Sequence, residues 1–178
     1  YGTYASFIVP MGFKGKVQAE VVDNVNHTSG RMNADGSIVE DNKIHKEKSS
    51  VEIVAADEER VPRDANNIPL YKLETVPVTV TVTDTFSGIE KIEWYIANDK
   101  KQGTISVDIN GKYTNDSQEA VIAEEDILRD SNLVTKISFG INVTDNSNGN
   151  AVTVRLTDRA GNTSDLQKMY SIDRTKPA

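Results

Sequence analysis

The chain has 178 residues, an apolar fraction of 37%, only 6% aromatic residues and a formal net charge of −7. This length allows one large domain or one and a half small ones, and so few aromatic residues favour a thin two-layer sandwich over a deep enzyme core. The acidic balance argues against nucleic acid and anionic membranes as partners. Since the chain has no cysteine, disulfides and thiolate chemistry are excluded.

Apolar residues at every second position predict β-strands along most of the chain. The clearest segments, in chain order, are residues 75–84, 88–99, 103–111, 133–145, 151–158 and 168–173. The side chains expected to face the core are Val76, Val78, Val80 and Val82; Ile92, Trp94 and Ile96; Ile105, Val107 and Ile109; Leu133, Ile137, Phe139, Ile141 and Val143; Val152, Val154 and Leu156; and Met169 or Tyr170 with Ile172.

Only residues 123–130 (AEEDILRD) indicate a helix, of about two turns, which would connect two strands. Many short strands separated by turn signals otherwise predict an all-β sandwich with at most one short helix. Asn110-Gly111 is a typical hairpin turn and should end one strand.

The sequence also contains a short internal repeat. Residues 15–29 (GKVQAEVVDNVNHTS) align with residues 150–164 (NAVTVRLTDRAGNTS), which places Asp23 on Asp158 and Ser29 on Ser164. The repeat predicts tandem modules. Residues 1–56 would be the end of a preceding module or extra strands, the polar residues 57–68 a linker, and residues 69–178 a complete module.

Two segments resemble the bacterial Ig-like repeats of large cell-surface proteins and adhesins: VTVTVTDTFSGIEKIEWYI (residues 78–96) and VTVRLTDRAGNTSDLQKMYSIDRTKP (residues 152–177). The resemblance covers roughly residues 69–178, and the first repeat copy departs from it with Asn26 and His27 in place of Gly161 and Asn162. It implies an immunoglobulin-like β-sandwich strung in tandem outside a bacterial cell, and no particular ligand. The matching positions are Asp84, Ser87, Gly88 and Ile89; Asp158, Ala160, Gly161 and Asn162; and Asp173, Thr175 and Pro177.

Two of these motifs are best interpreted as structural turns. In "DTFSG", Asp84 and Ser87 are turn formers and Gly88 supplies a positive φ. In "DRAGN", Asp158 bonds backbone N–H groups while Gly161 and Asn162 accept left-handed backbone. The alternative interpretation of each corner is an ion-binding loop.

Calcium has candidate ligands in two places. Asp57, Glu58, Glu59 and Asp64 lie close together in the expected linker, where a cation bridging carboxylates would stiffen a junction between modules. Asp84 is a further candidate, although one carboxylate is far short of the 6–8 oxygen ligands that calcium prefers. The alternative for the linker residues is a solvated acidic hinge.

A ligand that stacks on aromatic rings has three candidate partners. Trp94 alternates with two inward isoleucines and is expected in the core, whereas Tyr95 points outward. Tyr71 and Tyr113 could join Tyr95, but nothing in the sequence brings the three together.

Catalysis has little support. His27 and His45 lie in polar, loop-like sequence, and Glu124 and Glu125 are adjacent, so they would not share a helix face. A crosslink between Lys72 and Asn142 is a nominal alternative for covalent chemistry. We therefore expect that the protein is not an enzyme.

The expected function is a non-catalytic structural or interaction module of an exported bacterial surface protein, a stalk or spacer in adhesion. The alternative is a carbohydrate- or host-protein-binding module, including an accessory domain of a secreted glycoside hydrolase. The expected partners are neighbouring repeats and a host glycan or protein. We expect no nucleic acid, no membrane insertion and no cofactor other than the calcium weighed above, with the protein at the bacterial cell surface or secreted.

Overall fold

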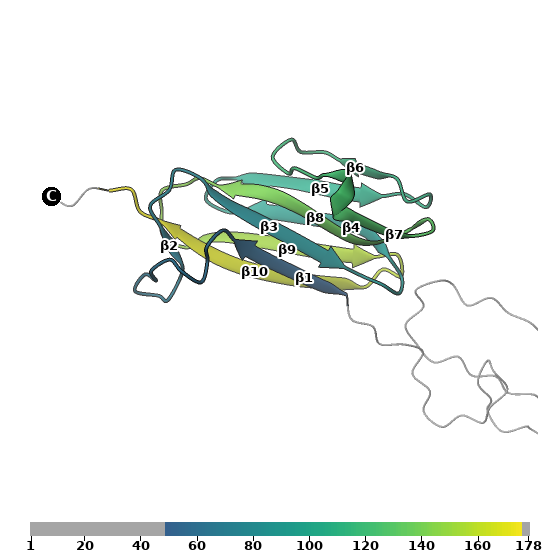
Figure 1. Cartoon of the computed structure of the whole chain (residues 1–178), viewed down its shortest axis with the longest axis horizontal. Helices are drawn as coiled ribbons and strands as arrows, with labels where there is room; N and C mark the ends of the chain where they lie inside the picture. Colours follow the sequence, from purple (N-terminus) through teal and green to yellow (C-terminus); the bar gives the residue numbers. More distant parts are fainter. Residues whose placement is uncertain (1–48, 176–178) are drawn as a thin grey trace, which may run out of the picture.

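The structure is a computed structural model, and it describes residues 49–175. Two β-sheets pack face to face around one core (Figure 1), which confirms the all-β prediction. One sheet has the strand order β1-β3-β8-β7 and the other the order β2-β10-β9-β4-β5-β6. The elements are β1 (Ser50–Ala55), β2 (Leu70–Tyr71), β3 (Val76–Thr83), β4 (Ile89–Ile96), β5 (Lys101–Val107), β6 (Tyr113–Asn115), the 3-10 turn η1 (Glu124–Asp126), β7 (Ile127–Asp130), β8 (Leu133–Val143), β9 (Asn150–Asp158) and β10 (Thr163–Ile172).

Alternating apolar residues form the core, because successive side chains of a strand point to opposite faces of its sheet. In β3 the four valines are at most 1% exposed, and in β4 Ile92, Trp94 and Ile96 are at most 3% exposed. The predicted inward residues of β9 are buried as well, and in β10 Tyr170 rather than Met169 faces inward. The periodicity of the sequence thus predicted which face of β3, β4 and β9 packs inward, whereas it left β10 open between Met169 and Tyr170.

Three local predictions were wrong. Residues 123–130 form no connecting helix: after η1 the chain extends into β7, where Ile127 pairs with Ile137 of β8. Pairing with a neighbouring strand outweighs the weak helix preference of so short a segment. Ile109 is 79% exposed, because β5 ends at Val107 and the next residues form a turn closed by a hydrogen bond from Gly111 N–H to Asp108 O. In β8 the first inward residue is Val134 rather than Leu133, next to an irregular register with β7.

Strand β1 belongs to the same sandwich as β3. It pairs with β3 from Ser50–Thr83 to Ala55–Val78 and buries Ile53 in the core. This part of residues 1–56 is therefore an extra strand, and residues 57–68 connect two strands of one sandwich instead of linking two modules. The other copy of the repeat, with Asn26 and His27, lies outside the described residues, as does His45.

The described chain begins and ends at opposite ends of the sandwich (Figure 1). β1 starts beside the end of β3, whereas β10 ends beside β2, where Ile172 pairs with Tyr71. Within residues 49–175 we find no helix with the length and hydropathy to cross a membrane.

Candidate functional site

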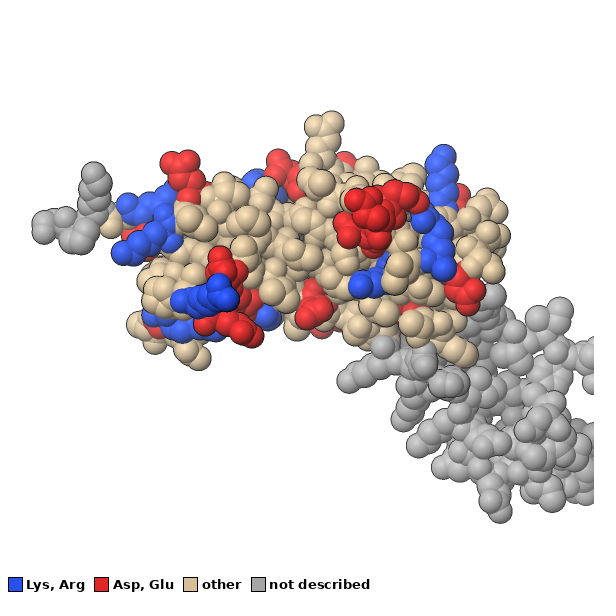
Figure 2. All heavy atoms as spheres, viewed as in Figure 1, with Lys and Arg blue, Asp and Glu red and all other residues tan. Residues whose placement is uncertain are grey.

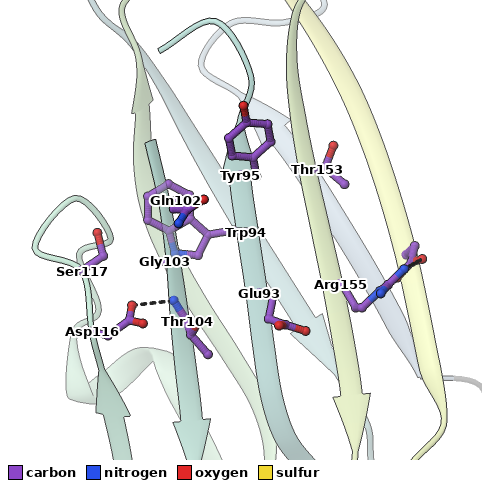
Figure 3. A pocket seen from close by; sticks show the side chains of 11 residues that line it. Glu93, Trp94, Tyr95, Gln102, Gly103, Thr104, Asp116, Ser117, Thr153 and Arg155 are labelled. Carbon is purple, nitrogen blue, oxygen red and sulfur yellow. Dashed lines mark hydrogen bonds and ion pairs between the residues drawn. The ribbon is translucent and has the colours of Figure 1, made fainter. Parts of the chain in front are cut away.

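The outer face of the six-stranded sheet is hollowed over β4, β5 and β9. The hollow has a volume of about 610 Å³, and Figure 3 shows the side chains that line it. Its lining is mostly polar, with one exposed aromatic ring. The lining residues are Glu93, Trp94, Tyr95, Gln102, Gly103, Thr104, Asp116, Ser117, Thr153, Arg155 and Asp165.

Strand register arranges the outward side chains of this face in two rows that cross four strands. The first row is Gln102, Tyr95, Thr153 and Gln167, on β5, β4, β9 and β10. The second row is Thr104, Glu93, Arg155 and Asp165 on the same strands. Directly paired residues point to the same face of a sheet, so each row is a continuous strip of surface.

The first row contains the aromatic ring. Tyr95 is 42% exposed, and its hydroxyl donates a hydrogen bond to Ala97 O at 3.3 Å. Beside it the Gln167 side-chain amide donates to Thr153 Oγ1 at 2.8 Å. The ring therefore stands among short and medium polar side chains rather than among other rings (Figure 3).

The second row carries the charge. Arg155 donates two hydrogen bonds to the Asp165 carboxylate, at 2.8 and 2.9 Å, and this contact holds the pKa of Asp165 below its usual value. Glu93 pairs with Lys91 at 3.2 Å. At the side of the hollow, Asp116 Oδ1 accepts a hydrogen bond from Thr104 N–H at 2.6 Å. Among the lining residues, three carboxylates face one guanidinium, so the hollow is acidic on balance.

Trp94 and Gly103 form the base of the hollow. The Trp94 side chain is on the inward face and only 3% exposed. Its Nε1 is buried, with no hydrogen-bond partner among residues 49–175. A Cβ at Gly103 would lie 2.7 Å from Trp94 Nε1 and 2.6 Å from Ser117 Cβ, so glycine is required for this close packing.

The three tyrosines do not come together. Tyr71 is 2% exposed, donates a hydrogen bond to Ala56 O at 3.0 Å and meets Tyr170 edge to face, with ring centroids 6.3 Å apart. Burial raises its pKa to about 12. Tyr113 is half-buried against the core, paired with the inward Val107. Tyr71 and Tyr113 are thus core residues, and only Tyr95 is placed to stack on a ligand.

The acidic residues proposed for calcium are also separated by their own contacts. Glu58 accepts hydrogen bonds from Ala55 N–H, Lys168 Nζ and Tyr170 Oη at 3.1, 2.8 and 3.2 Å. Burial acts to raise the pKa of Glu58, but these bonds outweigh it and the pKa lies below its usual value. Glu58 thus fastens the end of β1 to β10.

Asp64 closes the loop between β1 and β2. Its carboxylate accepts hydrogen bonds from Ser171 Oγ at 2.6 Å, Asn66 N–H at 2.8 Å and Ile68 N–H at 3.0 Å, which lower its pKa. Asp57 and Glu59 are exposed, and Asp57 lies 3.9 Å from Arg60. In the part of the chain that the structure describes, no group of three Asp, Glu, His or Cys side chains is arranged to hold a metal ion.

The "DTFSG" corner is a turn between β3 and β4. Asp84 Oδ1 accepts hydrogen bonds from the N–H groups of Phe86, Ser87 and Gly88, at 2.7–3.1 Å. Gly88 has a φ of 76°, and a Cβ there would come within 2.3 Å of Leu133 Cδ1. Asp84 is 2% exposed, and its other oxygen has no partner among the described residues.

The "DRAGN" corner is a similar turn between β9 and β10. Asp158 Oδ1 accepts hydrogen bonds from Ala160 N–H and Asn162 N–H at 2.9 and 2.8 Å, and the Asn162 side-chain amide also reaches the carboxylate. Gly161 has a φ of 80°. In both corners the aspartate carboxylate thus accepts hydrogen bonds from backbone N–H groups of its own turn, which is the usual role of aspartate in a structural turn.

The remaining candidates lie apart from the hollow. Lys72 and Asn142 are both exposed, so neither has the buried surroundings that a protein crosslink would need. Glu124 and Glu125 lie in η1, and Glu124 pairs with Arg129 at 2.7 Å. On the face shown in Figure 2, acidic and basic groups are interspersed.

A second hollow, of about 430 Å³, lies at the end of the sandwich where β1 begins. It is lined by Ile109, Asp130, Ser131, Asn132, Leu133 and Arg159. The backbone N–H of Arg159 donates a hydrogen bond to Gly88 O, and its guanidinium donates one to Asp108 O. The exposed Ile109 makes this hollow more apolar than the one around Tyr95.

No family model matches this sequence, and a search of curated proteins finds no match. The resemblance to bacterial Ig-like repeats therefore stays a prediction from the motifs around Asp84 and Asp158.

Most of the polar lining of the first hollow was missed at the sequence level. Thr153 and Arg155 are outward residues of β9, which pairs with β4, a strand distant from it in sequence, so strand order was needed to bring them beside Tyr95 and Glu93. One pair was within reach: Arg155 and Asp165 lie at equal distances on either side of Ala160, in the turn of a hairpin. A hairpin turn fixes the register of its two strands, and this register predicts that ion pair.

Proposed function

We propose that this chain carries a non-catalytic Ig-like module of an exported bacterial surface protein, acting as a stalk or spacer in adhesion. The observation that carries the proposal is the path of the chain, which enters at one end of the sandwich and leaves at the other (Figure 1). The longest strand, β8, has 11 residues. At ~3.3 Å per residue, a module of this kind adds roughly 35 Å to a row of similar modules.

The strand order supports the Ig-like part of the proposal. In variable-type immunoglobulin domains one sheet has strands A, B, E and D, and the other has G, F, C, C′ and C″. Lettered in chain order, β1-β3-β8-β7 follows A-B-E-D and β10-β9-β4-β5-β6 follows G-F-C-C′-C″. In this lettering β4 corresponds to strand C, which carries a buried tryptophan in immunoglobulin domains, and Trp94 is a buried tryptophan on β4. Since the chain has no cysteine, no disulfide joins the sheets here.

Hydrogen bonds fix the direction of the chain at both ends, as a spacer requires. Where the chain leaves, Asp173 N–H donates to Tyr71 O at 2.9 Å and Arg174 N–H donates to Asn146 Oδ1 at 2.8 Å. Where it enters, Ser164 Oγ donates to Ser49 O at 3.3 Å. A segment joined at either end would therefore continue from a defined position rather than from a free tether.

Single-molecule pulling tests this proposal. The chain lacks cysteine, so paired cysteines introduced at Ser50 and Thr175 give unique handles at the two ends. Pulling on them applies force along β1 and β10, parallel to the strands. The backbone hydrogen bonds that pair β1 with β3 and β10 with β9 must then break together. Handles at Lys72 and Thr175, both at one end, load the strand pairs one bond at a time.

We expect the end-to-end pair to unfold at a several-fold higher force than the same-end pair. Equal forces in the two geometries would contradict the spacer role.

A further inference from the structure

We propose that the hollow over β4, β5 and β9 binds a short, uncharged oligosaccharide. This role goes beyond that of a spacer, which needs no ligand. It rests on three properties of the hollow: its shape, the single exposed ring of Tyr95, and its charge.

The shape suits an elongated ligand lying across the strands. Each row of side chains crosses four strands, and neighbouring strands are ~4.8 Å apart, so a row is about 14 Å long. The volume of about 610 Å³ lies in the usual range for small-molecule sites. Asp116 and Ser117, which follow β6, line the hollow on the side of β5 (Figure 3).

Tyr95 supplies the apolar contact that a sugar ring needs. A pyranose presents C–H groups on its faces and hydroxyls around its rim, so it stacks on an aromatic ring and forms hydrogen bonds at its edges. Tyr95 is 42% exposed and has Gln102 and Thr153 on either side in its row. Amide and hydroxyl groups both donate and accept hydrogen bonds, as rim hydroxyls require.

The charge of the hollow favours an uncharged sugar over an anionic one. Glu93, Asp116 and Asp165 contribute three carboxylates to the lining. The one guanidinium among the lining residues, Arg155, already pairs with the Asp165 carboxylate through two hydrogen bonds, so its positive charge is offset within the hollow. An acidic sugar would meet net repulsion, whereas sugar hydroxyls can donate to the carboxylate oxygens.

The structure also supplies a reporter and matched controls. Trp94 is the only tryptophan in the chain and lies at the base of the hollow, so its fluorescence should respond to an occupied site. Thr79 and Leu128 lie on the other sheet, where Thr79 is an exposed hydroxyl of β3 and Leu128 a 53% exposed apolar residue of β7. Thr79→Val matches Thr153→Val, and Leu128→Ala matches Tyr95→Ala.

The experiment titrates the whole chain with the neutral hexasaccharides of glucose, xylose, mannose and N-acetylglucosamine, and follows Trp94 fluorescence and calorimetric heat. Polygalacturonate serves as the anionic probe and hexalysine as the basic peptide. We expect saturable binding of at least one neutral sugar, weakened about tenfold or more by Tyr95→Ala and less by Thr153→Val, with both control variants unchanged.

Three results would overturn the proposal: binding of none of the four sugars, tighter binding of polygalacturonate or hexalysine, or a neutral sugar whose affinity Tyr95→Ala leaves unchanged. None of them bears on the pulling experiment, so the spacer role and the sugar site can fail separately.

Discussion

The outer face of the six-stranded sheet carries Tyr95 and the Arg155–Asp165 pair around a hollow, whereas the outer face of the four-stranded sheet carries short side chains at its centre. There, Thr81 and Ser138 lie opposite each other with their hydroxyls 3.1 Å apart, and the next row contains Gly140. Both sheets show the same alternation of apolar and polar residues. The difference teaches that alternation fixes which residues are buried, while the outward residues remain free to form a site on one face only.

Two glycines, one in each sheet, give the largest expected contrast. Gly103→Ala places a Cβ 2.6 Å from Ser117 Cβ and 2.7 Å from Trp94 Nε1, so we expect a loss of about 2–3 kcal/mol of unfolding free energy. At Gly140 a Cβ meets nothing within 4 Å, so alanine should be neutral or slightly stabilising. Urea unfolding of the two variants measures both. If Gly103→Ala lost as little unfolding free energy as Gly140→Ala, the packing around Trp94 would not be tight.

Glu58 connects the two sheets, since it lies just after β1 and accepts hydrogen bonds from Lys168 and Tyr170 of β10. Glu58→Ala leaves the buried Tyr170 hydroxyl and Lys168 without their partner, and we expect a loss of about 1–2 kcal/mol. The exposed neighbour Glu59 supplies the control, Glu59→Ala, which should change stability little.

Glu58 also makes stability depend on pH. Its pKa in the folded state lies below the ordinary 4.5, so its contribution is present above pH 4.5 and is lost as the pH falls through the lowered pKa. The difference between wild type and Glu58→Ala, measured from pH 7 downward, should therefore shrink below pH 4.5. A constant difference would argue that Glu58 acts by packing and not by charge.

The Arg155–Asp165 pair should matter less to stability, because both side chains are about half exposed. We expect Arg155→Ala to cost less than Glu58→Ala, and the cost to disappear in about 1 M salt, where charges are strongly screened. Asp165 has a lowered pKa, so any contribution is lost as the pH falls below its ordinary value of 3.8. Thermal melts in low and high salt are sufficient, and a salt-independent loss would point to packing.

Tyr95→Ala should have the smallest effect on folding. The ring is 42% exposed, so we expect a change within about 0.5 kcal/mol, similar to that of Leu128→Ala on the other sheet. A clearly larger loss for Tyr95→Ala would make Tyr95 a structural residue. Any weakening of sugar binding in that variant would then reflect unfolding.

The sequence predicted the layers of this fold better than its edges or its site. The valines of β3 and the row Ile92, Trp94 and Ile96 were assigned to the core because burial of one face imposes a period of two. Residues 123–130 were misassigned because this short segment has one Ile-Leu pair among charged residues and no clear period, and only the pairing of its second half with β8 makes that half a strand.

The hollow depends on contacts between strands that are distant in sequence. Tyr95 was expected to point outward, and Gln102 lies beside it on the next strand along the chain, but its other neighbour, Thr153, is defined by the pairing of β4 with β9. Alternation is the same for every order of strands, so it cannot reveal which outward residues become neighbours. Tyr71 shows the reverse error: a two-residue strand beside β10 buries a ring that the sequence left free for a ligand.

The most direct test of the contrast between the two faces is a map of backbone amide chemical shifts, recorded while the whole chain is titrated with the best-bound neutral hexasaccharide. We expect saturable chemical-shift changes at Tyr95, Gln102 and Thr153, and unchanged chemical shifts at Thr79, Thr81 and Ser138. Shifts confined to the four-stranded sheet, or spread equally over both faces, would contradict this expectation.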